Sequence, residues 1–279
     1  MKVILAEYAG FCFGVKRAIN TAQKAAAKAK GKIYTYGPLI HNPQVVQKFE
    51  KAGVHAVSNI KKVGKGASLV IRTHGVPPET EKEFARKALN IVDATCPFVK
   101  KAQKLAAGLE HEGYQTVIIG EAHHPEVKGI LGYTGNKAVV IGSSAEAHKI
   151  KKCGKIGVVV QTTQSMDKFL KIVSLLMDKA PEIRVFNTIC DATKKRQESA
   201  LKLAGKVDIM IVVGGKNSAN TKHLAELCEE RGVPTYHIEG ALELKKSWFT
   251  GKKVAGVTAG ASTPDWIIKT VIKTINAPA

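Results

Sequence analysis

The fold is decided by the stretch Ile91-Val92-Asp93-Ala94-Thr95-Cys96-Pro97, in which an apolar run leads to a loop cysteine and then to a basic helix. The same order of features occurs in Phe186-Asn187-Thr188-Ile189-Cys190-Asp191-Ala192-Thr193. It occurs again near the start, where an apolar run from residue 3 leads into Gly10-Phe11-Cys12-Phe13-Gly14-Val15. Such self-similarity indicates an internal repeat.

The spacing downstream of each cysteine continues the repeat. After each cysteine an apolar run ends in a glycine. Gly37 follows the first cysteine by 25 residues, and Gly120 and Gly214 follow the second and the third by 24. A polar residue comes four positions later and precedes a helical pattern (His41, His124 and Ser218). Three repeats of about 90 residues fill the chain. We expect domains at residues 14–96, 97–190 and 191–279, with the strand in residues 1–13 added to the sheet of the third.

Strands that alternate with helices are typical of the α/β class, with parallel sheets and crossover helices. We expect, for example, a strand at 33–36 and a helix that follows Cys12 and runs to about Lys30. Ligands of parallel sheets collect at the carboxyl ends of the strands, where all the repeated polar residues lie. Three pseudo-equivalent domains around an approximate threefold axis would bring these loops to one centre.

The three repeated cysteines predict a metal site with an open position. A [4Fe–4S] cluster held by three thiolates would leave one iron free, and a zinc ion with three ligands would leave a site for water. Buried thiols without a metal are the third alternative. Cys228 lies in a helical pattern and is expected to be a small core residue, whereas Cys153 supports no sharper prediction.

The other repeated loop residues suit the binding of an anion. His41, His74, Ser218, Asn220, Ser262 and Thr163 offer neutral or cationic donors, which an anion needs in number. Glu126, in His123-His124-Pro125-Glu126, is the carboxylate of these loops and the candidate general acid. The alternative for Glu126 is an acid that stabilises the N-terminus of a helix.

Composition excludes some classes of protein. Across 279 residues no stretch approaches the roughly 20 apolar residues of a membrane span. Glu7 and Gly10 interrupt the first apolar run, so we expect no signal peptide and a cytoplasmic protein. The net charge of +20 fits a lysine-rich solvated surface, an anionic substrate or an acidic protein partner. Nucleic acid is the weaker alternative, because aromatic residues make up only 6% of the chain.

From end to end the chain resembles the 4-hydroxy-3-methylbut-2-enyl diphosphate reductase family, which acts last in the methylerythritol phosphate route to isoprenoids. The resemblance rests on an ordered set of motifs: residues 9–15, Gly37-Pro38-Leu39-Ile40-His41-Asn42, Arg72-Thr73-His74-Gly75, Asp93-Ala94-Thr95-Cys96-Pro97, His123-His124-Pro125-Glu126, Gln161-Thr162-Thr163, Asn217-Ser218-Ala219-Asn220 and residues 258–266.

The resemblance implies a trefoil of three α/β domains around a [4Fe–4S] cluster bound by Cys12, Cys96 and Cys190. The substrate hydroxyl would bind the fourth iron and leave as water after two electrons and two protons are added. The products would be isopentenyl and dimethylallyl diphosphate. Glu126 would supply protons, with Thr162 linking it to the substrate. The diphosphate would be bound by the remaining candidates: His41, His74, His124, Thr163, Ser218, Asn220 and Ser262.

An acidic ferredoxin or flavodoxin as electron donor would suit the basic surface. The chain departs from many relatives at Ala219, where a second serine is common, so one hydroxyl contact to the diphosphate is expected to be missing. We expect no appended RNA-binding domain. Two hypotheses compete with the reductase: an iron–sulfur dehydratase that needs no reductant, and a nucleic-acid-binding protein with structural cysteines.

Overall fold

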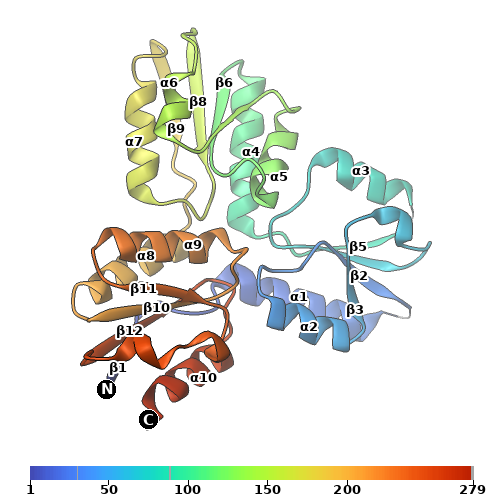
Figure 1. Ribbon diagram of the computed structural model, residues 1–279. Helices are drawn as coiled ribbons and strands as arrows, with labels where there is room; N and C mark the ends of the chain where they lie inside the picture. Colours follow the sequence, from blue (N-terminus) through green and yellow to red (C-terminus); the bar gives the residue numbers. More distant parts are fainter. Residues whose placement is uncertain (30, 88, 278–279) are drawn as a thin grey trace. The chain divides into compact units, whose positions relative to one another are not determined.

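The computed structural model describes residues 1–29, 31–87 and 89–277 (Figure 1). The predicted helix end at Lys30 and the predicted domain end at residue 279 lie outside these ranges. The strands form three parallel four-stranded sheets, and helices alternate with the strands along the chain. The predicted α/β class is therefore confirmed.

The three sheets have the same topology. In spatial order, the first contains β3 (Val54–Val57), β2 (Ile33–Tyr36), β4 (Ser68–Ile71) and β5 (Asn90–Asp93). The second contains β7 (Val139–Ile141), β6 (Gln115–Ile119), β8 (Lys155–Val160) and β9 (Glu182–Phe186). The third contains β11 (Thr235–Ile238), β10 (Ile209–Val213), β12 (Val254–Ala259) and β1 (Lys2–Leu5).

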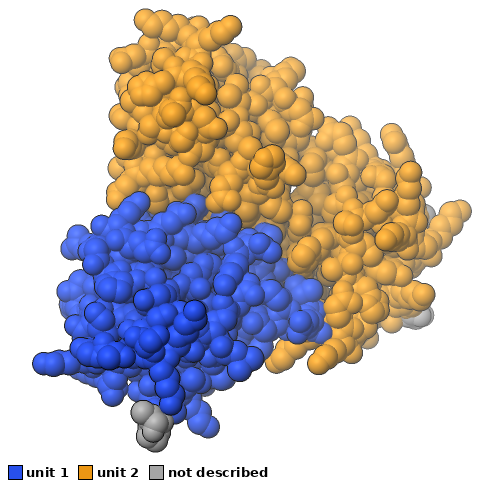
Figure 2. Space-filling model, in the orientation of Figure 1, with its two compact units in different colours: residues 1–16, 40–47, 191–279 blue, residues 17–39, 48–190 orange. Residues whose placement is uncertain are grey.

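The N-terminal strand completes the third sheet. Lys2 of β1 pairs with Val254 of β12, in the place that β5 and β9 occupy at the edges of the other two sheets. The chain divides into two compact units (Figure 2). Unit 1 comprises residues 1–16, 40–47 and 191–279 and holds the third sheet; unit 2 comprises residues 17–39 and 48–190 and holds the other two. The three predicted domain boundaries stay a prediction.

Helices connect the strands. The first in chain order are α1 (Phe13–Lys28), α2 (Pro43–Lys51), α3 (Pro78–Arg86), α4 (Pro97–His111), α5 (Pro125–Tyr133) and α6 (Ser144–His148). They are followed by α7 (Met166–Leu176), α8 (Asp191–Ala204), α9 (Ala219–Glu230) and α10 (Asp265–Asn276). Short 3-10 turns lie at Ile60–Lys62, Ala241–Glu243 and Lys246–Phe249. Within the described ranges, no helix combines the length and the apolar character that crossing a membrane requires.

The central strands are buried on both faces, which explains their unbroken apolar sequences. In unit 1, Met210 and Val212 of β10 pack with side chains of α8 and α9, whereas Ile209 and Ile211 pack with those of α10. Cys228 of α9 is fully buried in the first of these cores, as predicted. In unit 2, the two faces of β6 and β8 pack against α7 and against α4 and α5. These rigid cores fix the strand ends from which the candidate site residues extend.

Candidate functional site

Each repeated cysteine follows an edge strand and is held by an equivalent backbone hydrogen bond. The Cys12 N–H donates to the carbonyl of Ala261 at 3.1 Å. In unit 2, the Cys96 N–H donates to the carbonyl of Thr73 at 2.9 Å, and that of Cys190 to Thr162 at 3.1 Å. In every case the acceptor lies in the loop after the neighbouring strand, and a helix begins within one residue of the cysteine. The sequence repeat is thus also a repeat of local geometry.

The three repeated thiols differ from those of Cys153 and Cys228 because each lies directly before the start of a helix. None of the five cysteines forms a disulfide, and the three repeated ones are partly exposed beside helix N-termini. The Cys12 Sγ accepts the N–H of Val15 at 3.4 Å. By contrast, burial raises the pKa of Cys228 to about 12, so this thiol stays protonated. The chemistry of the repeated cysteines therefore fits a set of metal ligands.

A buried carboxyl group lies at the N-terminus of α5. Glu126 is 2% exposed. Its Oε1 accepts the backbone N–H of Thr162 at 2.6 Å, and its Oε2 accepts the Thr162 hydroxyl at 2.8 Å. Burial raises the pKa of Glu126 to about 7, although both hydrogen bonds from Thr162 act to lower it. A carboxyl group with this pKa is available as a proton donor at neutral pH.

Two histidines of unit 2 follow on from this carboxyl group: His124 lies two residues before Glu126, and His74 contacts His124. The Nδ1 of His124 accepts the N–H of Glu126 at 3.2 Å, which assigns a proton to Nε2 and directs that nitrogen to act as a donor. The ring of His74, after β4, meets the ring of His124 edge to face with centroids 5.3 Å apart. The adjacent Thr163 accepts a hydrogen bond from Gln161 Nε2 at 3.1 Å.

In unit 1, the start of α9 holds two of the predicted residues. The hydroxyl of Ser218 accepts the N–H of Thr221 at 3.4 Å and caps the helix. Asn220 is 4% exposed, yet neither its Oδ1 nor its Nδ2 has a hydrogen-bond partner in the described part of the chain. An unsatisfied buried amide is costly, and a native one calls for an explanation such as a ligand.

The loop after β12 is joined to the segment that carries His41. The Ser262 hydroxyl donates to the carbonyl of His41 at 3.0 Å. That carbonyl also lies close to the backbone of Gly215, where a Cβ atom would come within 2.5 Å of the His41 oxygen. Only glycine permits this approach, which brings the loop before Ser218 against the His41 segment.

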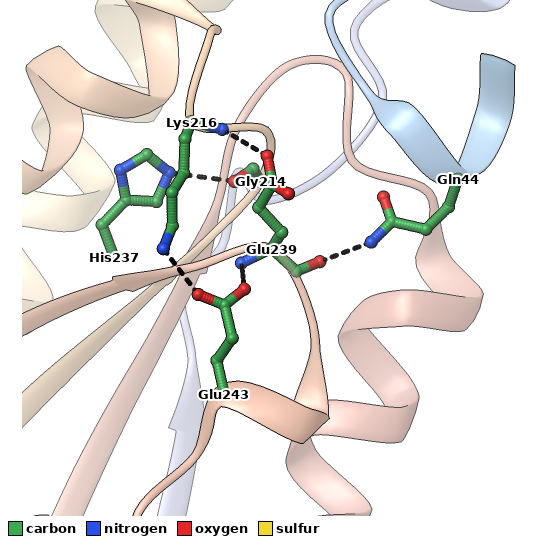
Figure 3. A network of polar contacts seen from close by, with 6 residues as sticks. All are labelled: Gln44, Gly214, Lys216, His237, Glu239 and Glu243. Atoms are coloured by element: carbon green, nitrogen blue, oxygen red, sulfur yellow. Dashed lines mark hydrogen bonds and ion pairs between the residues drawn. The ribbon is translucent and has the colours of Figure 1, made fainter.

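A network that the sequence did not predict supports the loop Gly214–Ser218 (Figure 3). The Lys216 N–H donates to Glu239 Oε1 at 2.7 Å, and the Lys216 ammonium pairs with Glu243 at 2.7 Å. The Nε2 of His237 lies 2.9 Å from the carbonyl of Gly214. Burial lowers the pKa of His237, so the ring is neutral at pH 7 and Nε2 donates this bond. Side chains at the end of β11 and directly after it therefore hold the loop that ends at Ser218.

The predicted site residues fall into two groups, one in each unit. Unit 1 contains Cys12, His41, Ser218, Asn220 and Ser262; unit 2 contains His74, Cys96, His124, Glu126, Thr162, Thr163 and Cys190. Direct contacts join Glu126 to Thr162, His74 to His124 and Ser262 to His41. The residues missed from the sequence are His237 of β11 and the two glutamates that follow this strand, Glu239 and Glu243, because β11 carries no strong apolar pattern.

Comparison with known proteins decides the family, because a model of the LytB protein family matches residues 3–276. The chain belongs to the LytB protein family. A LytB relative from Geotalea uraniireducens, named 4-hydroxy-3-methylbut-2-enyl diphosphate reductase, is 56% identical over 275 residues, which cover 99% of this chain and 97% of the relative. A relative of the same name from Geobacter sulfurreducens is 52% identical, with the same coverage.

Solved structures of the LytB family have the same fold. One, described as (E)-4-hydroxy-3-methyl-but-2-enyl diphosphate reductase, is 45% identical and superposes with a TM-score of 0.72 over 99% of both chains. The reductase from Plasmodium falciparum is 30% identical and gives a TM-score of 0.96 over 99% of this chain and 88% of its own. The resemblance recognised from the sequence motifs is confirmed, as is the expectation of an oxidoreductase family.

Proposed function

We propose that this chain is a 4-hydroxy-3-methylbut-2-enyl diphosphate reductase. It converts (E)-4-hydroxy-3-methylbut-2-enyl diphosphate into isopentenyl and dimethylallyl diphosphate with two electrons and two protons. The observation that carries the proposal is the placement of Cys12, Cys96 and Cys190 at equivalent strand ends with equivalent backbone bonds. Similarity to reductases along the whole chain supports it.

Cys12, Cys96 and Cys190 would hold a [4Fe–4S] cluster. Their fit rests on three partly exposed thiols that form no disulfide and lie beside helix N-termini, in contrast to the buried Cys228. When bound, a cluster with three thiolates supplies single electrons and one iron without a protein ligand. The removal of a hydroxyl group from an allylic alcohol requires both the electrons and the open iron.

The proposed ligands of the diphosphate are His41, His74, His124, Thr163, Ser218, Asn220 and Ser262. The unsatisfied amide of Asn220 supports this role, because a bound oxyanion would satisfy its Nδ2. Because His124 Nδ1 accepts the N–H of Glu126, the ring carries its proton on Nε2, and Nε2 is therefore a donor. At Ala219 no hydroxyl is present, and only its backbone N–H at the start of α9 could serve.

Glu126 would supply the protons, and Thr162 would pass them to the substrate. In the reaction the carbon–oxygen bond breaks and the hydroxyl leaves as water after taking one proton. The second proton adds to either end of the remaining allyl fragment and thereby selects the product. The raised pKa of Glu126 supports this role, because the carboxyl group holds a proton near neutral pH. The hydroxyl of Thr162 bonds directly to that carboxyl group.

An acidic ferredoxin or flavodoxin is the proposed electron donor, in keeping with the net charge of +20. A cytoplasmic location is part of the same proposal.

The test is an anaerobic assay of the purified protein with its iron content measured in parallel. We expect about four irons and four sulfides per chain, and turnover of the diphosphate substrate with reduced methyl viologen. Each of Cys12→Ser, Cys96→Ser and Cys190→Ser should lose iron and activity, whereas the matched control Cys228→Ser should keep both. Water loss without any reductant would favour the dehydratase instead, and absence of iron after reconstitution would exclude the reductase.

A further inference from the structure

A basic groove in unit 2 begins beside one of the repeated cysteines. It is open and has a volume of about 530 Å³. Its lining comes from the N-terminal half of α4, the residue before Cys96 and one side chain of α1: Arg17, Thr95, Pro97, Lys100, Lys101, Lys104 and Leu105. Four of these seven residues are cations, and no carboxylate lines the groove.

The helix geometry of α4 produces the groove. Pro97, Lys100, Lys101 and Lys104 follow the spacing i, i+3, i+4 and i+7, which places them on one face of a helix over about 10 Å. The opposite face carries the buried residues Ala102, Ala106 and Leu109, which pack into a core of unit 2. This packing holds the basic face outward. The basic face begins at Pro97, one residue after Cys96.

Most of the charge in the groove is uncompensated. The Lys100 ammonium pairs with Asp93, so one of the four cations is neutralised. The Arg17 Nη1 donates to the carbonyl of Thr95 at 2.9 Å, which fixes the guanidinium beside Cys96 without removing its charge. The structure records no ion pair for Arg17, Lys101 or Lys104 within its described residues. The N-terminus of α4 adds to the positive potential.

These features fit an acidic protein better than a nucleic acid. No aromatic ring lines the groove, so unpaired bases would have nothing to stack on. The basic stripe is also too short to follow an extended phosphate backbone. Electron transfer, by contrast, falls off steeply with distance, so a donor protein has to dock close to a ligand of the cluster. The groove adjoins such a ligand, Cys96.

We infer that the groove formed by Arg17, Lys100, Lys101 and Lys104 is the docking surface for an acidic one-electron carrier protein. The inference rests on the proposed function, because it takes Cys96 to be a cluster ligand. Carboxylates of the carrier face Lys101, Lys104 and Arg17, and its redox centre lies toward the α4 N-terminus. Interfaces of redox partners are small and transient, and their association depends on electrostatic steering.

The test uses the full chain with its cluster and two kinds of reductant. The double variant Lys101→Glu/Lys104→Glu should lower kcat/KM for a reduced acidic ferredoxin at least about tenfold at low salt. Its activity with reduced methyl viologen, a small cation that needs no docking surface, should stay unchanged. The defect should shrink as salt is added, because salt screens the charges that steer association.

The matched control is Lys151→Glu/Lys152→Glu. It makes the same change in net charge in the same unit, on exposed residues that precede β8, at the far end of that strand from Thr162. An equal loss in the control, or an equal loss with methyl viologen, would overturn the inference. Salt-sensitive binding of a single-stranded RNA probe to wild-type protein, abolished by Lys101→Glu/Lys104→Glu, would also overturn it. If the wild type is inactive even with methyl viologen, the proposed function itself has failed.

Discussion

The carboxyl group of Glu126 receives two hydrogen bonds from one residue, Thr162, which lies 36 positions later in the chain. One comes from the backbone N–H and the other from the hydroxyl, so both carboxyl oxygens are held in a fixed orientation. The pair links the start of α5 to the loop after β8. That loop also accepts the backbone N–H of Cys190. A candidate acid and a candidate metal ligand thus share one positioning residue.

The raised pKa of Glu126 predicts how stability depends on pH. A carboxyl group whose pKa rises from 4.5 to about 7 on folding stabilises the protein fully below about pH 4.5. This contribution is lost as the pH rises through 7, because ionising a buried acid is unfavourable. The loss is roughly 3 kcal/mol at 1.36 kcal/mol per pKa unit. Thermal unfolding between pH 5 and 8 should show a steeper decline for wild type than for Glu126→Gln. Parallel curves would show that Glu126 titrates normally.

Glu126→Gln should also lower kcat with reduced methyl viologen by about 100-fold or more, the usual contribution of general acid catalysis. The amide keeps the size of the side chain but supplies no proton. Iron content and KM for the substrate should change little. Glu83→Gln, on an exposed position of α3, is the matched control. Near-wild-type turnover by Glu126→Gln would remove Glu126 from the proton pathway.

Asn220→Ala should weaken substrate binding while it stabilises the free protein. The amide has no partner in the described part of the chain, so its removal relieves a desolvation cost of about 1–3 kcal/mol. The same removal deletes a proposed donor to the diphosphate, so KM should rise at least about tenfold. Thermal unfolding and steady-state kinetics measure the two effects. A variant that is both less stable and unchanged in KM would contradict the assigned role.

Glu239 offers a test of the network behind the Gly214–Ser218 loop. Glu239→Ala removes the acceptor for the Lys216 N–H, so the loop should loosen and KM should rise several-fold, at a stability cost of about 1 kcal/mol. Glu239→Gln keeps a carbonyl oxygen at this place and should behave nearly as wild type. The ion pair between Lys216 and Glu243 is partly exposed and should matter little to stability. Equal KM values for the Ala and Gln variants would show that the network does not position Ser218.

The sequence predicted the central strands well, because both their faces are buried and their apolar runs are unbroken. It missed the edge strands β3 and β11, which read Val-His-Ala-Val and Thr-Tyr-His-Ile and are partly exposed. An edge strand has one neighbour and needs no apolar run, and these two lack one, so their signal in the sequence is weak. Helix starts lay close to the cysteines, as the repeat indicated: α8 begins at Asp191, directly after Cys190.

For the candidate site, sequence could place residues at strand ends but not define their contacts. The repeat located Cys12, Cys96 and Cys190, since equivalent strands end at equivalent points. It could not show that Thr162 binds both oxygens of Glu126, because that contact depends on how two loops pack. The sequence also did not predict the partners of the Gly214–Ser218 loop, because Glu239 follows a strand that was not predicted.

The pairing of β1 with β12 has a consequence for the order of events during synthesis. Lys2 leaves the ribosome 252 residues before its partner Val254. The loop of Cys12 is held by Ala261, so it cannot take its final shape until residue 261 has been translated. Contacts this distant in sequence also form late in folding. Delivery of the proposed cluster to all three cysteines would therefore be post-translational, and Cys12 would have to be kept reduced until then.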